Sequence, residues 1–297
     1  GASTYGAGGL SSLPVLNGLA DERVRVQVDG MDLLAACPNH MNSPLSYMPS
    51  SEVHEITVYK GVAPVSVGGD SLGGTIQVKR APPAFASSLE GLRHRAELGG
   101  YARDNGQARG LHAKASVATE RFWLQVSGDT SRADNVHAAA PFKPAAAGTE
   151  GGRVIPGAEI ASSAYRAHNE AVGMAWQHDQ HLVRLDVAQQ QVGFEGFPNQ
   201  RMDMLDNQQQ RINLRYQGDY DWGRLEARAY HEKVEHFMDF GADKRFWYGG
   251  SVANDVIIGS GGPTVLNGTP CSPLSPACAA GMPMNTESKN TGFALKG

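Results

Sequence analysis

The chain has 297 residues, with 26 Lys and Arg against 30 Asp and Glu, so its formal net charge is −4. Glycine supplies 36 residues, and only 19% of the chain is charged. A weakly acidic, glycine-rich chain lacks the basic stripe of a nucleic-acid-binding protein. No apolar run approaches the ~18 residues that a transmembrane helix needs. The sequence therefore excludes nucleic acid as an expected partner and leaves β-strands as the means of crossing a bilayer.

The first part of the chain, residues 1–85, combines many glycines with short β-rich runs. Residues 23–28 alternate polar and apolar side chains, which predicts a half-buried strand, and Asp29-Gly30 predicts a tight turn after it. Residues 53–59 and 75–78 predict two further strands. The stiff segment Ala81-Pro82-Pro83-Ala84 is the expected domain boundary.

The rest of the chain, residues 86–297, predicts strands of about ten residues with one apolar and one charged face. The alternation is clearest over residues 111–117, 122–127, 183–188, 211–217 and 225–229. Such strands are typical of transmembrane barrels, although the strands of a soluble antiparallel sandwich alternate too. Short turns at 103–106 and 219–223, expected on one side, and long polar loops at 132–165 and 241–288, expected on the other, favour the barrel.

Three segments of the first part resemble one known domain. Residues 13–30, 53–61 and 67–78, in this order, resemble the plug domain of TonB-dependent outer-membrane receptors. The resemblance implies a mainly β protein, with a globular plug at 1–85 inside an antiparallel transmembrane β-barrel of ~22 strands that begins within 86–297. It also implies location in the bacterial outer membrane, contact with outer-membrane lipid, and a TonB-type energy-coupling protein in the periplasm as partner.

The second part is too short to complete such a barrel. We expect about eight strands in it, and an eight-stranded barrel has no room for a plug. The sequence is therefore expected to be a fragment, truncated in the plug at its beginning and in the barrel at its end.

The three cysteines have different expected roles. Cys271 and Cys278 flank a Pro-rich segment of a long polar loop, and we expect a disulfide between them. The alternative is two free thiols. Cys37 is then left without a partner, which is a liability outside the cell unless something binds it.

Cys37 belongs to a group of soft metal donors. Cys37 and Met41 are four residues apart, so on a helical turn their sulfurs would share a face. His236 and Met238 are two apart, so on a strand both side chains would point the same way. Thiolate, thioether and imidazole donors together select a soft ion, above all Cu(I).

This combination is similar to the copper site of the TonB-dependent copper receptors (the OprC and NosA type). The resemblance implies that Cys37, Met41, His236 and Met238 bind copper between plug and barrel. His40 could replace one of the four ligands. The pairs Met202/Met204 and Met282/Met284 could bind copper on its way inward. Alternatively, any of these Cys and Met residues could simply fill the core.

The sequence thus predicts an outer-membrane receptor that binds and imports copper. It is not expected to be an enzyme, because its Gly-rich segment at 68–74 lacks the following Lys of a phosphate-binding loop. Three alternatives stay open. They are a receptor for a chelated metal or another small nutrient, a structural β-protein without a transport role, and a copper enzyme.

Overall fold

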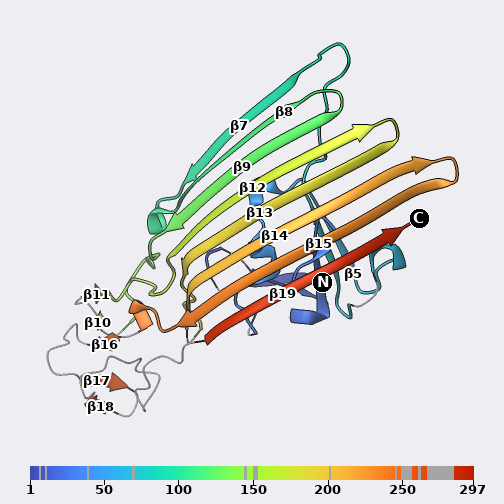
Figure 1. Ribbon diagram of the computed structural model, residues 1–297. Coiled ribbons are helices and arrows are strands. Elements are labelled where there is room, and N and C mark those ends of the chain that lie inside the picture. Colours follow the sequence, from blue (N-terminus) through green and yellow to red (C-terminus); the bar gives the residue numbers. More distant parts are fainter. Residues whose placement is uncertain are drawn as a thin grey trace.

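The computed structural model describes most of the chain and consists mainly of β-strands (Figure 1). The described residues are 1–6, 8–10, 12–38, 40–68, 71–143, 146–149, 153–200, 202–244, 246–248, 256–259, 262–265 and 284–297. Within them, no helix has the length and apolar character to cross a membrane. The helices there are single 3-10 turns, at Asp21–Arg23, Pro44–Tyr47, Ser50–Glu52, Val65–Val67, Asn105–Gln107 and Ala242–Lys244.

The N-terminal part folds as two small sheets. β1 (Ala2–Gly6) and β2 (Ser12–Leu16) pair antiparallel. The second sheet has the order β4-β3-β6-β5, formed by β3 (Val24–Val28), β4 (Met31–Asp32), β5 (Glu55–Lys60) and β6 (Gly74–Lys79). Asp29 and Gly30 have φ values of 49° and 74° and link β3 to β4. Two successive positive φ angles are what a tight hairpin turn requires, so the turn predicted there is confirmed.

The C-terminal part forms one antiparallel sheet of eight strands, called the wall below. Its order is β19-β15-β14-β13-β12-β9-β8-β7. The strands are β7 (Arg93–Ala102), β8 (Arg109–Ala118), β9 (Phe122–Ala133), β12 (Tyr165–His178), β13 (His181–Glu195), β14 (Asp203–Tyr220), β15 (Gly223–Asp239) and β19 (Met284–Lys296). Strands β12 to β15 have 14 to 18 residues, so the prediction of ten-residue strands was too short.

The connections of the wall divide between its two ends. The turns at 119–121, 179–180 and 221–222 lie at one end, and the longer connections lie at the other (Figure 1). The turn at 103–108 joins β7 to β8 at the long-loop end. The sequence prediction that it shares an end with the turn at 219–223 was therefore wrong. Turn length alone did not indicate that β7 runs toward the long loops.

Five minor strands lie at the long-loop end. β10 (Ala147–Thr149) pairs with β11 (Val154–Ile155) and β16 (Phe246–Tyr248). β17 (Val256–Gly259) pairs with β18 (Gly262–Val265).

The outer face of the wall changes from apolar to polar along a line that crosses the strands. Val126, Val172, Val187 and Ile212 are paired from strand to strand and form an exposed apolar row. Two residues nearer the long loops, the next outward row consists of Gly128, Glu170, Gln189, Gln210, Lys233 and Lys289. An outward apolar band with a polar edge is the pattern of a wall that faces lipid.

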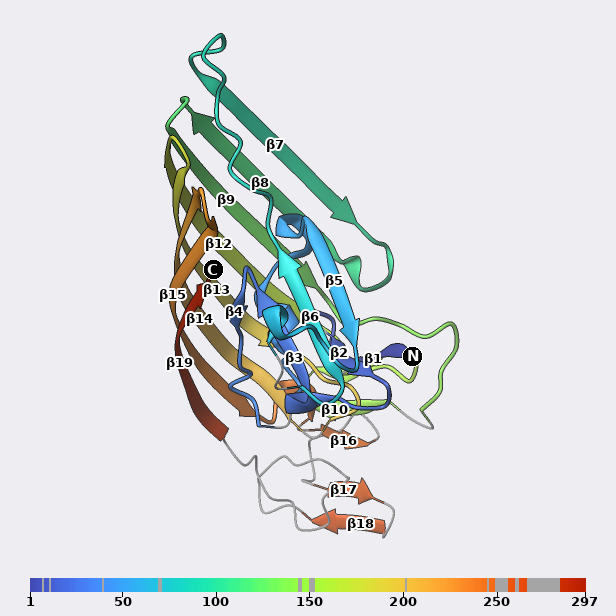
Figure 2. The same ribbon diagram turned by 90° about the vertical axis from the view of Figure 1, so that its right-hand side faces the viewer.

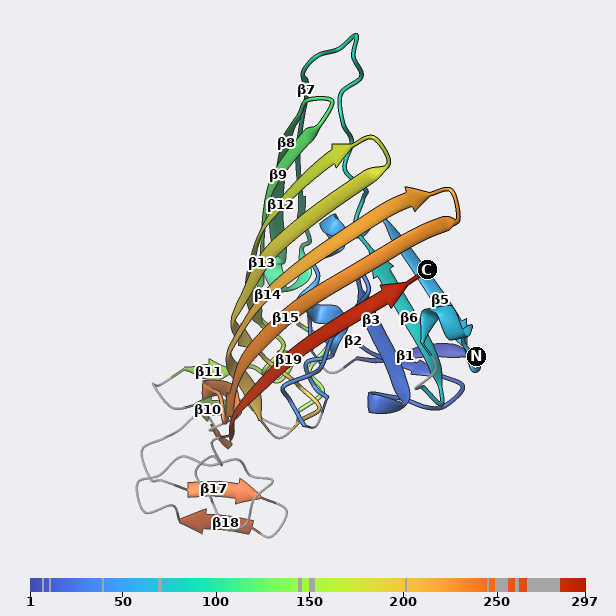
Figure 3. The ribbon, with the colours of Figure 1, turned by 45° about the vertical axis from the view of Figure 1, so that its right-hand side comes forward.

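The N-terminal sheets lie against the inner face of the wall (Figures 2 and 3). The apolar core between them includes Val28, Met31 and Tyr47 of the N-terminal part with Tyr230 and Val234 of β15. The sheets at 2–79 and the wall from residue 93 onward thus form a plug and a partial antiparallel barrel.

Candidate metal centre

A segment of the plug, residues 32–37, runs alongside β15. The backbone N–H of Asp32 donates to the Tyr230 hydroxyl at 3.3 Å, and that of Leu34 donates to Glu232 Oε2 at 3.4 Å. Thr286 Oγ1 of β19 donates to the Ala36 carbonyl at 2.9 Å. The segment therefore contacts the wall at every second residue as it approaches Cys37.

The segment ends in a contact between two sulfur atoms. Cys37 Sγ lies 3.7 Å from Met238 Sδ, and both residues are fully buried. They belong to one apolar group, called the sulfur cluster below. It comprises Cys37, Met41, Met202, Met204 and Met238 with Ala167, Val192, Phe197 and Phe240, and Leu10 and Met284 pack against it. Three of the four predicted metal ligands are thus in one cluster built from both plug and wall.

Cys37 and Met41 reach this cluster without a helix. Residues 33–38 have no regular secondary structure, the His40 N–H donates to the Cys37 carbonyl at 3.0 Å, and His40 has a φ of 52°. A tight turn followed by a left-handed residue reverses the chain, and it brings the two side chains into one cluster. The expected helical turn was wrong, although both residues do enter the same cluster.

His236, the fourth predicted ligand, lies on the inner face of β15. Val234, His236 and Met238 are all buried, as alternate residues of one strand face should be. His236 Nδ1 lies 3.0 Å from Asn207 Oδ1 of β14. His236 Nε2 is buried and has no hydrogen-bond partner. A buried ring nitrogen without a partner is free to bind a metal ion.

The other predicted donors differ in their surroundings. His40 Nε2 lies 2.7 Å from Glu22 Oε1, so this imidazole is engaged by a carboxylate. Met204 faces Met238 across β14 and β15, and Met284 faces Met238 across β15 and β19. Met282, Cys271 and Cys278 lie outside the described residues.

Connections at the long-loop end cover the sulfur cluster. Phe197 is fully buried in the cluster, and Lys244 Nζ donates to its carbonyl at 2.8 Å. Lys244 also lies 3.5 Å from Asp203 Oδ1. Burial lowers the pKa of Lys244, although the carboxylate of Asp203 opposes that shift. The buried ammonium therefore holds two connections together above the cluster.

Below the cluster, charged side chains join plug and wall. Arg80 Nε of the plug donates to Asp29 Oδ2 at 2.6 Å, and Arg80 also lies 3.5 Å from Asp186 of β13. Burial raises the pKa of Asp29, but the neighbouring Arg80 guanidinium lowers it further, so the carboxyl has a pKa below its ordinary value. The pair is therefore ionised at neutral pH.

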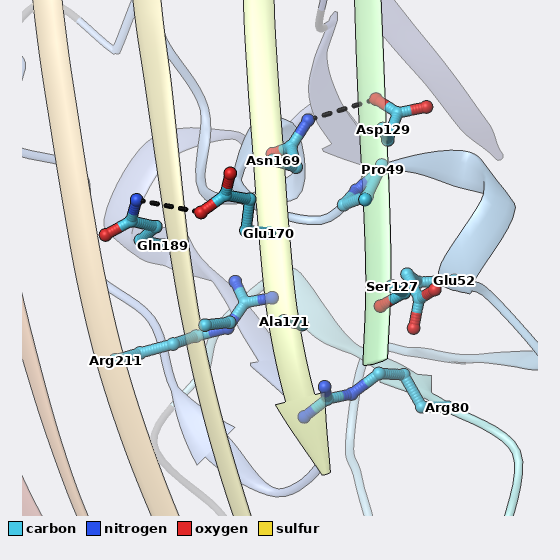
Figure 4. A pocket seen from close by; sticks show the side chains of 12 residues that line it. Pro49, Glu52, Arg80, Ser127, Asp129, Asn169, Glu170, Ala171, Gln189 and Arg211 are labelled. Carbon is cyan, nitrogen blue, oxygen red and sulfur yellow. Dashed lines mark hydrogen bonds between the residues drawn. The ribbon is translucent and has the colours of Figure 1, made fainter. Parts of the chain in front are cut away.

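The plug fits closely against the wall at this level. Figure 4 shows Arg80 and Glu52 of the plug beside Asn169 and Arg211 of the wall. Arg211 donates from a terminal guanidinium nitrogen to the Tyr47 carbonyl at 2.5 Å. The cavity among these residues is about 20 Å³, room for a single water molecule.

The chemistry of the donors suits a soft ion. Among the described residues, no three His, Cys, Asp or Glu side chains gather to form a metal site. The sulfur cluster instead offers one thiol and several thioethers, with an imidazole two residues from Met238. Sulfur donors favour Cu(I) over ions such as Mg²⁺ or Ca²⁺.

Asn207 is a polar neighbour that the sequence prediction missed. It is fully buried and pairs with His236 across β14 and β15. The signal that could have found it is the short turn at 219–223. A two-residue hairpin loop fixes the register of β14 and β15, and counting outward from the pair Tyr220 and Gly223 places Asn207 opposite His236.

A lipid-facing wall with a globular domain on its inner side is the architecture of a plugged outer-membrane β-barrel. Residues 1–75 match the family model described as TonB-dependent Receptor Plug Domain. The fold and this match together indicate a bacterial outer-membrane protein.

Solved structures with the same fold are transporters and receptors. The chain is similar to the copper transporter OprC at 23% identity and a TM-score of 0.67, over 80% of this chain and 34% of that one. It is similar to the FrpB iron transporter from Neisseria meningitidis (F3-3 variant) at 18% identity and a TM-score of 0.62, over 80% and 37% of the two chains. For the siderophore receptor PirA from Acinetobacter baumannii, the identity is 13% and the TM-score 0.57, over 80% and 36%.

The chain spans about a third of the length of these structures. No curated protein sequence matches it. At these identities the likeness establishes the fold, which agrees with the mainly β, plug-and-barrel architecture predicted from the sequence.

Proposed function

We propose that the protein is a TonB-dependent outer-membrane receptor that binds and imports copper. In this proposal residues 1–85 belong to the plug and residues 86–297 to the barrel. The cargo is Cu(I), held by Cys37 and Met41 of the plug and by His236 and Met238 of the wall. A TonB-type periplasmic protein then acts on the plug to open a path.

One observation carries the proposal. The thiol of Cys37 and the thioether of Met238 are 3.7 Å apart across the boundary between plug and wall, in a buried cluster that also contains Met41. The unpartnered Nε2 of His236 lies on the same strand face as Met238. A bound soft ion would satisfy that nitrogen and would join the two parts of the protein. The likeness to a copper transporter supports the choice of cargo.

The proposal is tested by metal analysis of the purified protein in detergent. The protein is loaded with Cu(I) under reducing conditions, separated from excess metal, and analysed for copper per chain. We expect one tightly held copper ion in the unmodified protein and its loss in Cys37→Ala, with the strand content unchanged by circular dichroism. Stoichiometric copper in Cys37→Ala would show that the ligand assignment is wrong.

A receptor for a chelated metal is the second candidate. The likeness to an iron transporter and to a siderophore receptor favours it. In that case the protein would retain a ferric chelate and no free Cu(I), and Cys37 would be a buried core residue. The same analysis, run in parallel with a ferric siderophore, separates the two.

A further inference from the structure

The contact between Asn207 and His236 bears on which ring nitrogen of the histidine can bind a metal. A neutral imidazole carries one proton, and the nitrogen without the proton is the one that can act as ligand. His236 Nδ1 lies 3.0 Å from Asn207 Oδ1, an oxygen that can only accept a hydrogen bond. The proton therefore lies on Nδ1, and Nε2 has a free lone pair.

The surroundings favour this arrangement. Asn207 is fully buried and His236 is 1% exposed, so water does not compete for either nitrogen. Asn207 and His236 are opposite each other in the pairing of β14 with β15, and this pairing fixes the distance between them. Nε2 is buried without any partner, so a proton there would have no acceptor, which costs free energy in the interior.

We infer that Asn207 is a positioning residue that holds His236 in the tautomer whose Nε2 binds the metal ion. This inference rests on the proposed function, because it assigns a role at the same site. Asn207 contacts the imidazole and not the metal ion, so it contributes to metal binding only through His236. Residues that accept a hydrogen bond from the second nitrogen of a metal-binding histidine orient the ring and raise its basicity.

The tautomer can be read directly, without any metal. Nitrogen NMR of protein labelled with ¹⁵N-histidine distinguishes protonated from unprotonated ring nitrogens, and the difference from the spectrum of His236→Gln identifies the signal of His236. We expect the proton on Nδ1 in the unmodified protein and a mixture of tautomers in Asn207→Leu. A proton on Nε2 in the unmodified protein would overturn the inference.

Copper affinity provides the second measurement, made by competition with a Cu(I) chelator. Asn207→Leu removes the acceptor at similar volume and is expected to weaken binding by about 10- to 100-fold. Asn207→Asp keeps an acceptor at the same place and is expected to restore the affinity to within about threefold of the original. Asn213→Leu is the matched control, because Asn213 is a buried residue of the same strand face that bonds to the plug at Asp29 instead.

The outcomes separate this inference from the proposed function. If the unmodified protein binds Cu(I) and Asn207→Leu binds it as tightly, the positioning role is wrong and the receptor proposal stands. If the unmodified protein binds no Cu(I), the proposed function is wrong. If Asn207→Leu fails to fold, the spectrum of the unmodified protein still decides the tautomer, and a lack of restored affinity in Asn207→Asp would also contradict the role.

Discussion

Cys37 Sγ and Met238 Sδ are 3.7 Å apart although their residues are separated by 201 positions in the chain. One belongs to an irregular segment of the plug and the other to a long wall strand. The contact is therefore made by the tertiary structure alone. It joins the two parts of the fold at the residues that carry the proposed copper site, and the following predictions start from it.

The first prediction separates the copper-binding role of Met238 from its packing role. Leu has nearly the volume of Met but no sulfur, so Met238→Leu should change the free energy of unfolding by less than about 1.5 kcal/mol. It should weaken Cu(I) binding by about tenfold or more, because a soft donor is lost. A chelator competition assay and thermal unfolding in detergent measure the two effects.

Met204→Leu is its matched control. Met204 is equally buried and faces Met238 on the neighbouring strand, but it is not among the four proposed ligands. We expect unchanged affinity in this variant. Equal losses of affinity in both variants would mean that Met204 also binds the ion and that the four-ligand assignment is wrong.

The second prediction concerns the buried ion pair between Asp29 and Arg80, which lies within the plug beside Asp186 of the wall. Asp29→Asn leaves the buried Arg80 with Asp186 as its remaining carboxylate, so we expect a loss of about 2–3 kcal/mol in the stability of the assembled protein. Glu55→Gln removes a half-exposed partner of Lys79 and should have almost no effect. Unfolding midpoints of the two variants in detergent make the comparison.

The effect of Asp29 depends on pH with a defined sign. Its folded pKa is below the ordinary value of 3.8, so its contribution is fully present above that value and is lost as the pH falls through the folded pKa. The difference between the unmodified protein and Asp29→Asn should stay constant from pH 8 to pH 5 and shrink in stronger acid. A difference that instead disappears between pH 7 and pH 5 would show that Asp29 is not held ionised.

The third prediction tests where lipid meets the wall. Val187 and Gln189 face outward on β13, two residues apart on either side of the change from apolar to polar side chains. Val187→Arg should destabilise the protein folded in lipid vesicles by about 2–4 kcal/mol, and Gln189→Arg by about 1 kcal/mol or less. Equal effects would place the edge of the membrane elsewhere.

The fourth prediction concerns the remaining cysteines. If Cys271 and Cys278 are bridged, alkylation of the denatured protein without reductant should label one of the three cysteines, and alkylation after reduction should label all three. Mass spectrometry counts the labels. Three labels without reductant would rule out the disulfide.

The local alternation of apolar and polar residues predicted the positions of the strands well and their lengths less well. The alternation over 183–188 and 211–217 identified strands of the wall, because the two faces of each strand meet different solvents. It underestimated their lengths, because β13 and β14 continue beyond the apolar row into positions such as Gln189 and Gln210, where both faces are polar. In these parts of the strands, buried and exposed residues still alternate, but both kinds are polar, so the sequence shows no alternation in hydrophobicity.

The candidate site was predictable only in part, for a related reason. The sequence does predict that His236 and Met238 face the same side, because residues two apart on a strand always do. It does not predict the path of residues 33–38, since the turn at Cys37 and His40 depends on contacts with β15 and β19. Asn207 was missed because its place opposite His236 follows from the register of the hairpin of β14 and β15, counted outward from the turn at 221–222, and not from any local pattern around position 207.

The contacts of residues 32–37 with the wall also define an order of detachment. They follow one another along β15 and β19, from Asp32 opposite the middle of β15 to Cys37 near the long loops. A pull that starts at the Asp32 end would peel these contacts off one after another instead of loading them together. The two sulfurs would part last, so an ion held between them, as proposed, would be released only after the rest of the segment had come away.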